Sequence, residues 1–145
     1  MKKVMFLLPR SVGHRLWEDG FLDALLEKEI DYMFREFSAC PMEPAQKYAV
    51  ALSRHGCDAI IYPELHSSIF LWHGARRDWF PAGAQEVGIV RFLQFLEEAG
   101  CGLLPLSMGY GPFDDSFEVT VHGNPIGFAE DVGSRIEAFR KGKGA

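Results

Sequence analysis

Residues 100–112 read Gly-Cys-Gly-Leu-Leu-Pro-Leu-Ser-Met-Gly-Tyr-Gly-Pro, an apolar run that ends in a small polar residue and a glycine-rich turn. A short run of bulky apolar residues between a helix and a turn of Gly and Pro is typical of a buried strand in a parallel sheet. In open α/β sheets, the residues just past such a strand line the ligand crevice. The sequence therefore predicts that Ser107 lies at a ligand crevice.

Strands and helices alternate on both sides of this run. The apolar spacing predicts strands over 3–8, 30–37 and 57–62, and helices over 16–28, 44–55 and 84–99, with a polar turn over 10–15. The strand over 30–37 is partly polar, which is typical of a sheet edge. Two further strands, 117–122 and 126–128, form a predicted hairpin that precedes a last helix. This order predicts a three-layer α/β sandwich with a mainly parallel sheet, a C-terminal β-hairpin and a helix.

Length and composition narrow the classes of protein that the chain fits. The 145 residues suit a single domain over 1–145, and the net charge of −5 with scattered basic residues disfavours a nucleic-acid partner. The three cysteines are widely spaced, which suits a reducing compartment. Cys57 and Cys101 begin predicted strands, so we interpret them as structural. No apolar run approaches the length of a membrane span, and we expect a cytoplasmic protein that does not bind a membrane.

The segment over 66–83 has the least regular pattern of the chain. It contains arginines and a cluster of aromatic residues over 69–80, namely Phe70, Trp72, Trp79 and Phe80. A connection of this length in a compact domain is usually a functional loop, a lid or a contact arm. Aromatic residues beside arginine are common in the cores of interfaces. The segment therefore predicts a lid or the contact of a homodimer.

Five segments together resemble a known family. Residues 17–25 read Trp-Glu-Asp-Gly-Phe-Leu-Asp-Ala-Leu, residues 58–66 read Asp-Ala-Ile-Ile-Tyr-Pro-Glu-Leu-His, and residues 119–126 read Val-Thr-Val-His-Gly-Asn-Pro-Ile. They are similar to the first helix, the strand that ends in Pro-Gly-Gly-His, and the last hairpin of the ThiJ/PfpI family, flavodoxin-like relatives of the class I glutamine amidotransferases. Residues 90–93 resemble the family's following helix, and residues 102–109 its nucleophile strand. The resemblance implies a flavodoxin-like fold.

The positions that carry the family's chemistry differ in this chain. The family's nucleophile is a Cys on a sharp turn from strand to helix, and the aligned residue here is Ser107. A serine needs an adjacent base to act as a nucleophile, whereas a thiol can be activated by a lowered pKa. The family's helix-borne Glu corresponds to Trp17, with Glu18 beside it, and its Gly-Gly is replaced by Glu64-Leu65, which disfavours an oxyanion there. The resemblance therefore argues for the fold and against the family's cysteine chemistry.

A catalytic site can still be written from these residues. Ser107 would be the nucleophile, His66 or His14 its base, and Glu64 the residue that orients the imidazole. The alternative is that Ser107 is a hydrogen-bonded small residue and that the histidines are surface groups.

Other residues are candidates for a ligand-binding site or a metal site. Arginine offers a planar fork of donors to phosphates and carboxylates, and the predicted crevice and loop carry the ligand-binding candidates Arg10, Ser11, His14, Arg15, Arg76 and Arg77. The alternative for the arginines is a set of solvated loop charges. Glu64, His66 and His73 lack a fourth ligand at a recognisable spacing, so no metal is predicted, and no cofactor is predicted either.

Three functions follow, from different classes. The first is a binding or regulatory module for a small anionic metabolite, which lacks the family's cysteine chemistry and acts as a homodimer. The second is a hydrolase or lyase that uses Ser107 with a nearby histidine. The third is a structural subunit that docks on another protein through the aromatic residues of the 69–80 loop.

Overall fold

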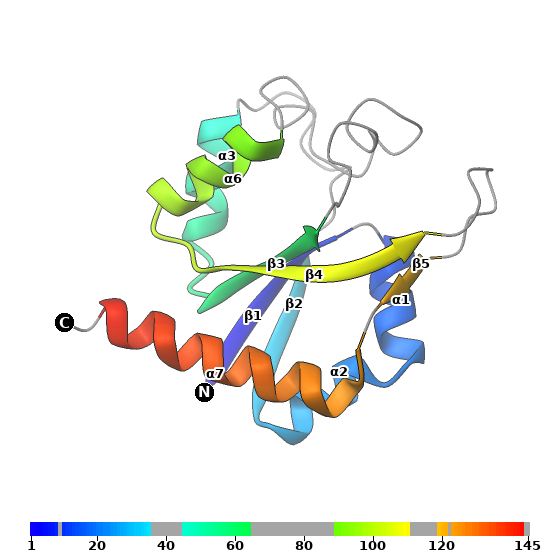
Figure 1. Ribbon diagram of the computed structural model, residues 1–145. Helices are drawn as coiled ribbons and strands as arrows, with labels where there is room; N and C mark the ends of the chain where they lie inside the picture. The colour runs from blue at the N-terminus through cyan, green and yellow to red at the C-terminus, as the bar shows by residue number, and fades with distance from the viewer. Residues whose placement is uncertain (9, 36–44, 65–88, 111–118, 122, 144–145) are drawn as a thin grey trace.

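The computed structural model describes residues 1–8, 10–35, 45–64, 89–110, 119–121 and 123–143 (Figure 1). Their elements follow in the order β1 (Lys2–Leu7), α1 (Arg10–Glu18), α2 (Phe21–Glu27), β2 (Ile30–Arg35), α3 (Ala45–Ser53), β3 (Ala59–Glu64), α6 (Ile89–Glu98), β4 (Leu103–Tyr110), β5 (Val119–Val121) and α7 (Pro125–Lys143). The predicted α/β class is confirmed.

The strands form one sheet in the order β2-β1-β3-β4-β5. Strands β2, β1, β3 and β4 are parallel, and β5 pairs with the end of β4 in the antiparallel direction. The mainly parallel sheet is confirmed, and β2 lies at its edge, as its partly polar sequence predicted. The order of the four parallel strands is compatible with a flavodoxin-like sheet.

Helices cover both faces of this sheet (Figure 1). Helices α3 and α6 lie on one face, and α1, α2 and α7 lie on the other. Both sides of the strands are apolar because both are covered, and β1 is buried from Val4 to Leu7. Each layer adds buried side chains to the core, such as Leu16 from α1, Leu25 from α2, Leu52 from α3, Phe92 from α6 and Ile136 from α7.

The helical region before β2 differs from its prediction. Residues 10–15, predicted as a polar turn, belong to α1, and the predicted helix over 16–28 is divided between α1 and α2. Gly20, with a φ of 83°, separates the two helices, a conformation that glycine adopts without strain. Gly13 lets α1 approach the sheet, because a Cβ atom there would lie 2.9 Å from Cε1 of Phe34. The missing side chain at Gly13 also weakened the apolar pattern that would have revealed this helix.

The predicted strand over 126–128 is wrong, because these residues lie in the first turns of α7. The side chain of Asn124 accepts a hydrogen bond from the backbone N–H of Gly127 at 2.7 Å, which caps the helix. Pro125 is the first helical residue, where its missing N–H costs nothing. Asn-Pro is therefore a helix start in this chain, and the hairpin predicted around it does not form.

Strand β4 is longer than predicted. It continues past Ser107 to Tyr110, and Met108, Gly109 and Tyr110 pair with β5. Pro105 lies within it, yet the sheet tolerates this proline. The backbone N–H of Ile60 donates to the carbonyl of Gly102 at 2.8 Å, so by alternation Leu104 also faces β3 and Pro105 faces the other side of the strand.

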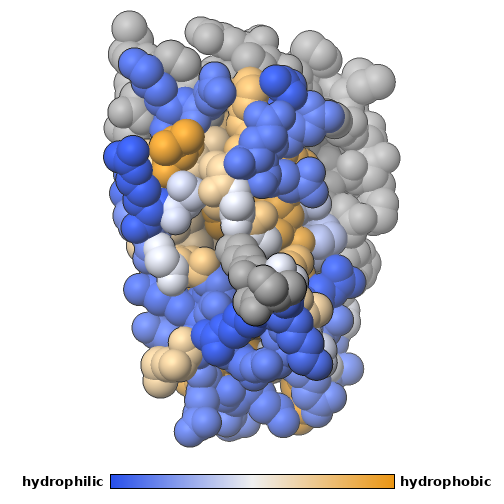
Figure 2. Space-filling view, turned by 90° about the vertical axis from the view of Figure 1, so that its left-hand side faces the viewer, coloured by the Kyte–Doolittle hydropathy of each residue, from blue (hydrophilic) through white to orange (hydrophobic). Residues whose placement is uncertain are grey.

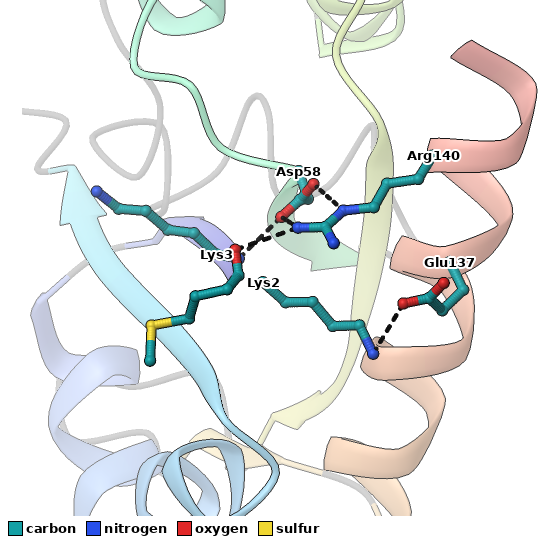
Figure 3. Close-up of polar contacts among 6 residues, drawn as sticks. Lys2, Lys3, Asp58, Glu137 and Arg140 are labelled. Atoms are coloured by element: carbon teal, nitrogen blue, oxygen red, sulfur yellow. Dashed lines mark hydrogen bonds and ion pairs between the residues drawn. The ribbon is translucent and has the colours of Figure 1, made fainter. Parts of the chain in front are cut away.

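A cluster of polar contacts fixes α7 to the amino ends of β1 and β3 (Figure 3). The guanidinium of Arg140 donates two bonds to the carboxylate of Asp58, at 2.7 and 2.9 Å, and a third to the carbonyl of Met1 at 3.1 Å. Asp58 also accepts the backbone N–H of Lys3 at 2.9 Å. Beside them, the ammonium of Lys2 lies 3.0 Å from the carboxylate of Glu137.

The surface at the carboxyl ends of α6 and α7 is mostly hydrophilic, with hydrophobic residues gathered in its middle (Figure 2). Several apolar side chains here are only partly buried, among them Leu103 at the start of β4 and Phe139 on α7. This side belongs to the amino ends of the strands. The ligand crevice of a parallel sheet is expected at the opposite edge.

Candidate functional site

The carboxyl edge of the sheet brings together segments that are distant in sequence. Strand β1 ends at Leu7 and β3 ends at Glu64, and because the strands are parallel, both ends lie at the same edge. The chain leaves β1 for β2 on one side and later returns to β3 on the other. The reversal of strand order therefore lies between β1 and β3, which is where open α/β sheets bind their ligands.

Helix α1 begins at this point of reversal. Arg10, its first residue, lies three positions beyond Leu7, and Ser11 follows within the first turn. The first turn of α1 contains no acidic residue. Its free backbone N–H groups and the positive end of the helix dipole therefore favour an anion at this edge. Two of the predicted ligand-binding residues, Arg10 and Ser11, thus lie at the carboxyl edge of the sheet by their place in the chain.

His14 and Arg15, also predicted to bind a ligand, lie one turn farther along α1. Nε2 of His14 lies 2.9 Å from the carboxylate of Glu18, and Nε of Arg15 donates to Asp19 at 3.0 Å. Both are i,i+4 pairs on an exposed surface of the helix. The structure therefore brings these two residues together with acidic neighbours of their own segment.

Trp17 is the residue at the position of the family's catalytic Glu. Its side chain is 60% exposed, and its ring lies 5.8 Å from the ring of His14. Trp17 therefore neither fills nor lines a buried pocket. Glu18 is paired with His14, as described above.

Ser107 and Glu64, two of the three predicted catalytic residues, are direct neighbours in the sheet. Register pairs Ser107 of β4 with Glu64, the last residue of β3. The sharp turn that follows the family's nucleophile is absent after Ser107, because β4 continues for three residues into its pairing with β5. A nucleophile on a strand-to-helix elbow is therefore not what this geometry provides.

The remaining candidates lie outside the described residues, so their predicted roles stay predictions. They are the catalytic candidate His66, the ligand-binding candidates Arg76 and Arg77, the metal candidate His73, and the aromatic residues of the 69–80 loop. Within the described ranges, no group of three His, Cys, Asp or Glu side chains is arranged to hold a metal ion.

Arg35, the last residue of β2, is not among the site residues predicted from the sequence. It pairs in register with Leu7, the last residue of β1, and so lies at the carboxyl edge. Its Nε atom is buried, and no hydrogen-bond partner for it exists among the described residues. From the sequence alone, an arginine at the end of an edge strand is expected to be solvated. Only the folded structure shows that its Nε atom is buried.

The two described cysteines are packed against the core, which agrees with the structural role predicted for them. The thiol of Cys57 lies 3.6 Å from the sulfur of Met33. Burial raises the pKa of Cys57 above its ordinary value, and the nearby Lys3 offsets this only in part. A raised pKa keeps the thiol protonated at neutral pH, which makes Cys57 a poor nucleophile.

A cavity of about 270 Å³ lies between β4 and the first turns of α7. Its lining includes the apolar residues Ile61, Leu104, Leu106, Phe128 and Val132. Of the polar residues that line it, Asn124 caps α7, and the carboxylate of Asp131 lies 3.5 Å from Nε of Arg135. Both side chains are engaged within α7, and we assign no ligand to this cavity.

Comparison with known proteins adds no relative to this description. No family model, no curated protein and no solved structure matches the chain. Among the described residues, no helix has both the length and the apolar character needed to cross a membrane.

Proposed function

We propose that the protein is a binding or regulatory module for a small anionic molecule, held at the carboxyl edge of the sheet between β1 and β3. We also propose that it is a cytoplasmic homodimer that resembles the ThiJ/PfpI family but lacks the family's cysteine chemistry. It rests on one observation above all: α1 begins at Arg10, directly at the reversal of strand order, with no acid in its first turn. An anion there would receive backbone N–H groups and the favourable end of a helix dipole.

The position of Ser107 supports binding over catalysis. A nucleophile in an α/β fold is usually raised on a strained turn, which exposes its oxygen and places free N–H groups around it. Ser107 instead lies within β4, paired on one side with β3, and the strand continues beyond it.

The test is anion binding by the wild-type protein and by Arg10→Glu. We would measure the melting temperature and a titration by calorimetry with sodium phosphate and sodium acetate, against sodium chloride at the same ionic strength. We expect phosphate or acetate to raise the melting temperature of the wild type and to bind with a measurable heat. Arg10→Glu should lose this response without loss of stability, because a glutamate in the first turn of a helix is favourable for the helix and repels an anion.

The matched control is Arg54→Glu, which reverses the charge of an exposed arginine in the turn after α3. It should bind the anion as the wild type does. Equal loss of binding in both variants would indicate a general effect of net charge and would reject the proposed site. A wild type that responds to neither anion would reject the proposed function.

A hydrolase or lyase is the second candidate, because the register places Glu64 directly beside Ser107. A carboxylate and a hydroxyl on neighbouring strands can form part of a relay if a histidine completes it. The test is hydrolysis of p-nitrophenyl acetate by the wild type and by Ser107→Ala. Turnover that disappears in Ser107→Ala would favour the enzyme, and equal rates would exclude this role of Ser107.

A further inference from the structure

Arg35 is unusual among the described arginines because its buried Nε has no hydrogen-bond partner in the described ranges. Each of four others lies within 4 Å of a carboxylate, the pairs being Arg15 with Asp19, Arg91 with Glu98, Arg135 with Asp131 and Arg140 with Asp58. For Arg35, Nε is buried and has no hydrogen-bond partner within the part of the chain that the structure describes.

A buried N–H group without a partner is costly, more so when the group is charged. Proteins retain such a group where a bound ion, water or ligand satisfies it. An apolar side chain of similar length would fill the same space without this cost. The presence of an arginine at this position is therefore not explained by packing alone.

Arg35 lies at the same edge of the sheet as the proposed ligand, on the strand that flanks β1 on the side away from β3. Arg35 and Leu7 are the last paired residues of β2 and β1, and the chain continues from Leu7 to the start of α1 at Arg10. Arg35 therefore lies at the carboxyl edge, next to the strand that leads to the first turn of α1. A planar guanidinium recognises carboxylates and phosphates through two parallel hydrogen bonds.

We propose that Arg35 binds the oxyanion of the ligand, a carboxylate or a phosphate, and that Nε is one of the donors that it uses. This inference rests on the proposed function and names a side chain that recognises the ligand. It predicts that removal of this donor raises the stability of the free protein and lowers its affinity for the ligand, since the donor has a partner only in the complex.

The experiment compares Arg35→Met, Arg35→Lys and the control Arg54→Met. The melting temperature is measured without ligand and in sodium phosphate or sodium acetate at constant ionic strength, and affinity for each anion by calorimetry. Without ligand, Arg35→Met should melt at a higher temperature than the wild type, because the buried donor without a partner is gone. It should bind the anion about tenfold or more weakly. Arg35→Lys should keep the charge but lose the planar guanidinium, and its affinity for the anion should lie between those of the wild type and Arg35→Met. Arg54→Met should match the wild type in affinity.

Three results would overturn the inference. A lower melting temperature for Arg35→Met without ligand would mean that the guanidinium is already satisfied within the chain. Wild-type affinity in Arg35→Met would exclude Arg35 from the site while leaving the proposed function intact. A wild type that responds to neither anion would reject the proposed function itself and remove the ligand that Arg35 is proposed to bind.

Discussion

Asp58 connects three parts of the chain through one carboxylate. It receives Arg140 from α7 and the backbone N–H of Lys3 from β1, and it lies just before β3, with its side chain only 17% exposed (Figure 3). Charge-assisted bonds in a partly buried place are stronger than exposed ion pairs. We expect Asp58→Asn to lower the free energy of unfolding by about 1–3 kcal/mol at pH 7, measured by urea denaturation. Glu137→Gln, at the exposed pair beside it, should change stability little, and an equal loss there would contradict this account.

The same carboxylate should produce a defined pH dependence. The hydrogen bond from Arg140, above all, holds the pKa of Asp58 below its ordinary value of 3.8. A carboxyl group with a lowered pKa in the folded state stabilises the fold above its unfolded pKa, and this stabilisation is lost as the pH falls through the folded pKa. The stability difference between the wild type and Asp58→Asn should be constant above about pH 5 and should shrink below about pH 4. Urea denaturation at a series of pH values measures it, and a difference that persists undiminished to pH 2 would contradict the prediction.

Gly102 lies where α7 crosses the beginning of β4. A Cβ atom at this position would lie 2.6 Å from Cδ2 of Phe139 and 3.0 Å from the backbone carbonyl oxygen of Asp58. We expect Gly102→Ala to lower the free energy of unfolding by about 1–3 kcal/mol, because the ring and the strand must both move. Gly142→Ala is the control: it lies on α7 with nothing within 4 Å, and it should stabilise by up to about 1 kcal/mol through helix propensity. Denaturation of both variants in parallel checks the difference, which vanishes if the contact at Gly102 is absent.

Helix α7 depends on its cap. The side chain of Asn124 accepts the backbone N–H of Gly127 at 2.7 Å, which satisfies one of the free donors of the first turn. Asn124→Ala should lower the free energy of unfolding by about 1 kcal/mol, as measured by thermal or urea denaturation. Asn124→Asp keeps the acceptor and adds a favourable charge at the helix start, so it should retain the stability of the wild type. Equal losses in the two variants would show that the cap is not what matters.

The elements that the sequence predicts well are those whose signal is local. The strands at 3–8 and 57–62 and the helix over 44–55 were predicted from apolar runs and spacing, and each appears with shifted ends as β1, β3 and α3. The parallel arrangement followed from the alternation of strands with helices. Such patterns are local because burial acts on every turn of a helix and every second residue of a strand.

The errors occur where the deciding contact is distant in sequence. Gly13 gives no sign of its contact with Phe34, and so residues 10–15 of α1 were predicted as a turn. The Asn-Pro pair before α7 is common both in turns and at helix starts, and the packing of the following residues decides between them. Arg35 was missed for the same reason, since an atom without a partner exists only in the packed protein. The register pairing of Ser107 with Glu64 was likewise not predicted, because it depends on how β3 and β4 align in the folded sheet.

The whole domain relies on α7 to close one face of the sheet. Ala129, Val132 and Ile136 of this helix are buried, and the ring of Phe128 lies 5.4 Å from that of Phe21 on α2. We expect a chain that ends at Asn124 to lose cooperative unfolding, measured by circular dichroism during urea titration, because these apolar contacts are lost together. A chain that ends at Lys141 keeps all the buried side chains of α7 and should unfold as one transition. Cooperative unfolding of the shorter chain would show that the sheet is stable without α7.

The bond from Arg140 to the carbonyl of Met1 has a consequence for how the protein is made. It joins the residue before β1 to the last turn of α7, which is synthesised later than all the other described elements. During synthesis, the apolar surface of β1 and α2 that α7 covers stays exposed until α7 has emerged. Helix α3 can pack on the other face of the sheet as soon as β3 is complete. The fold is therefore complete only after α7 has left the ribosome, and until then the nascent chain exposes this apolar face.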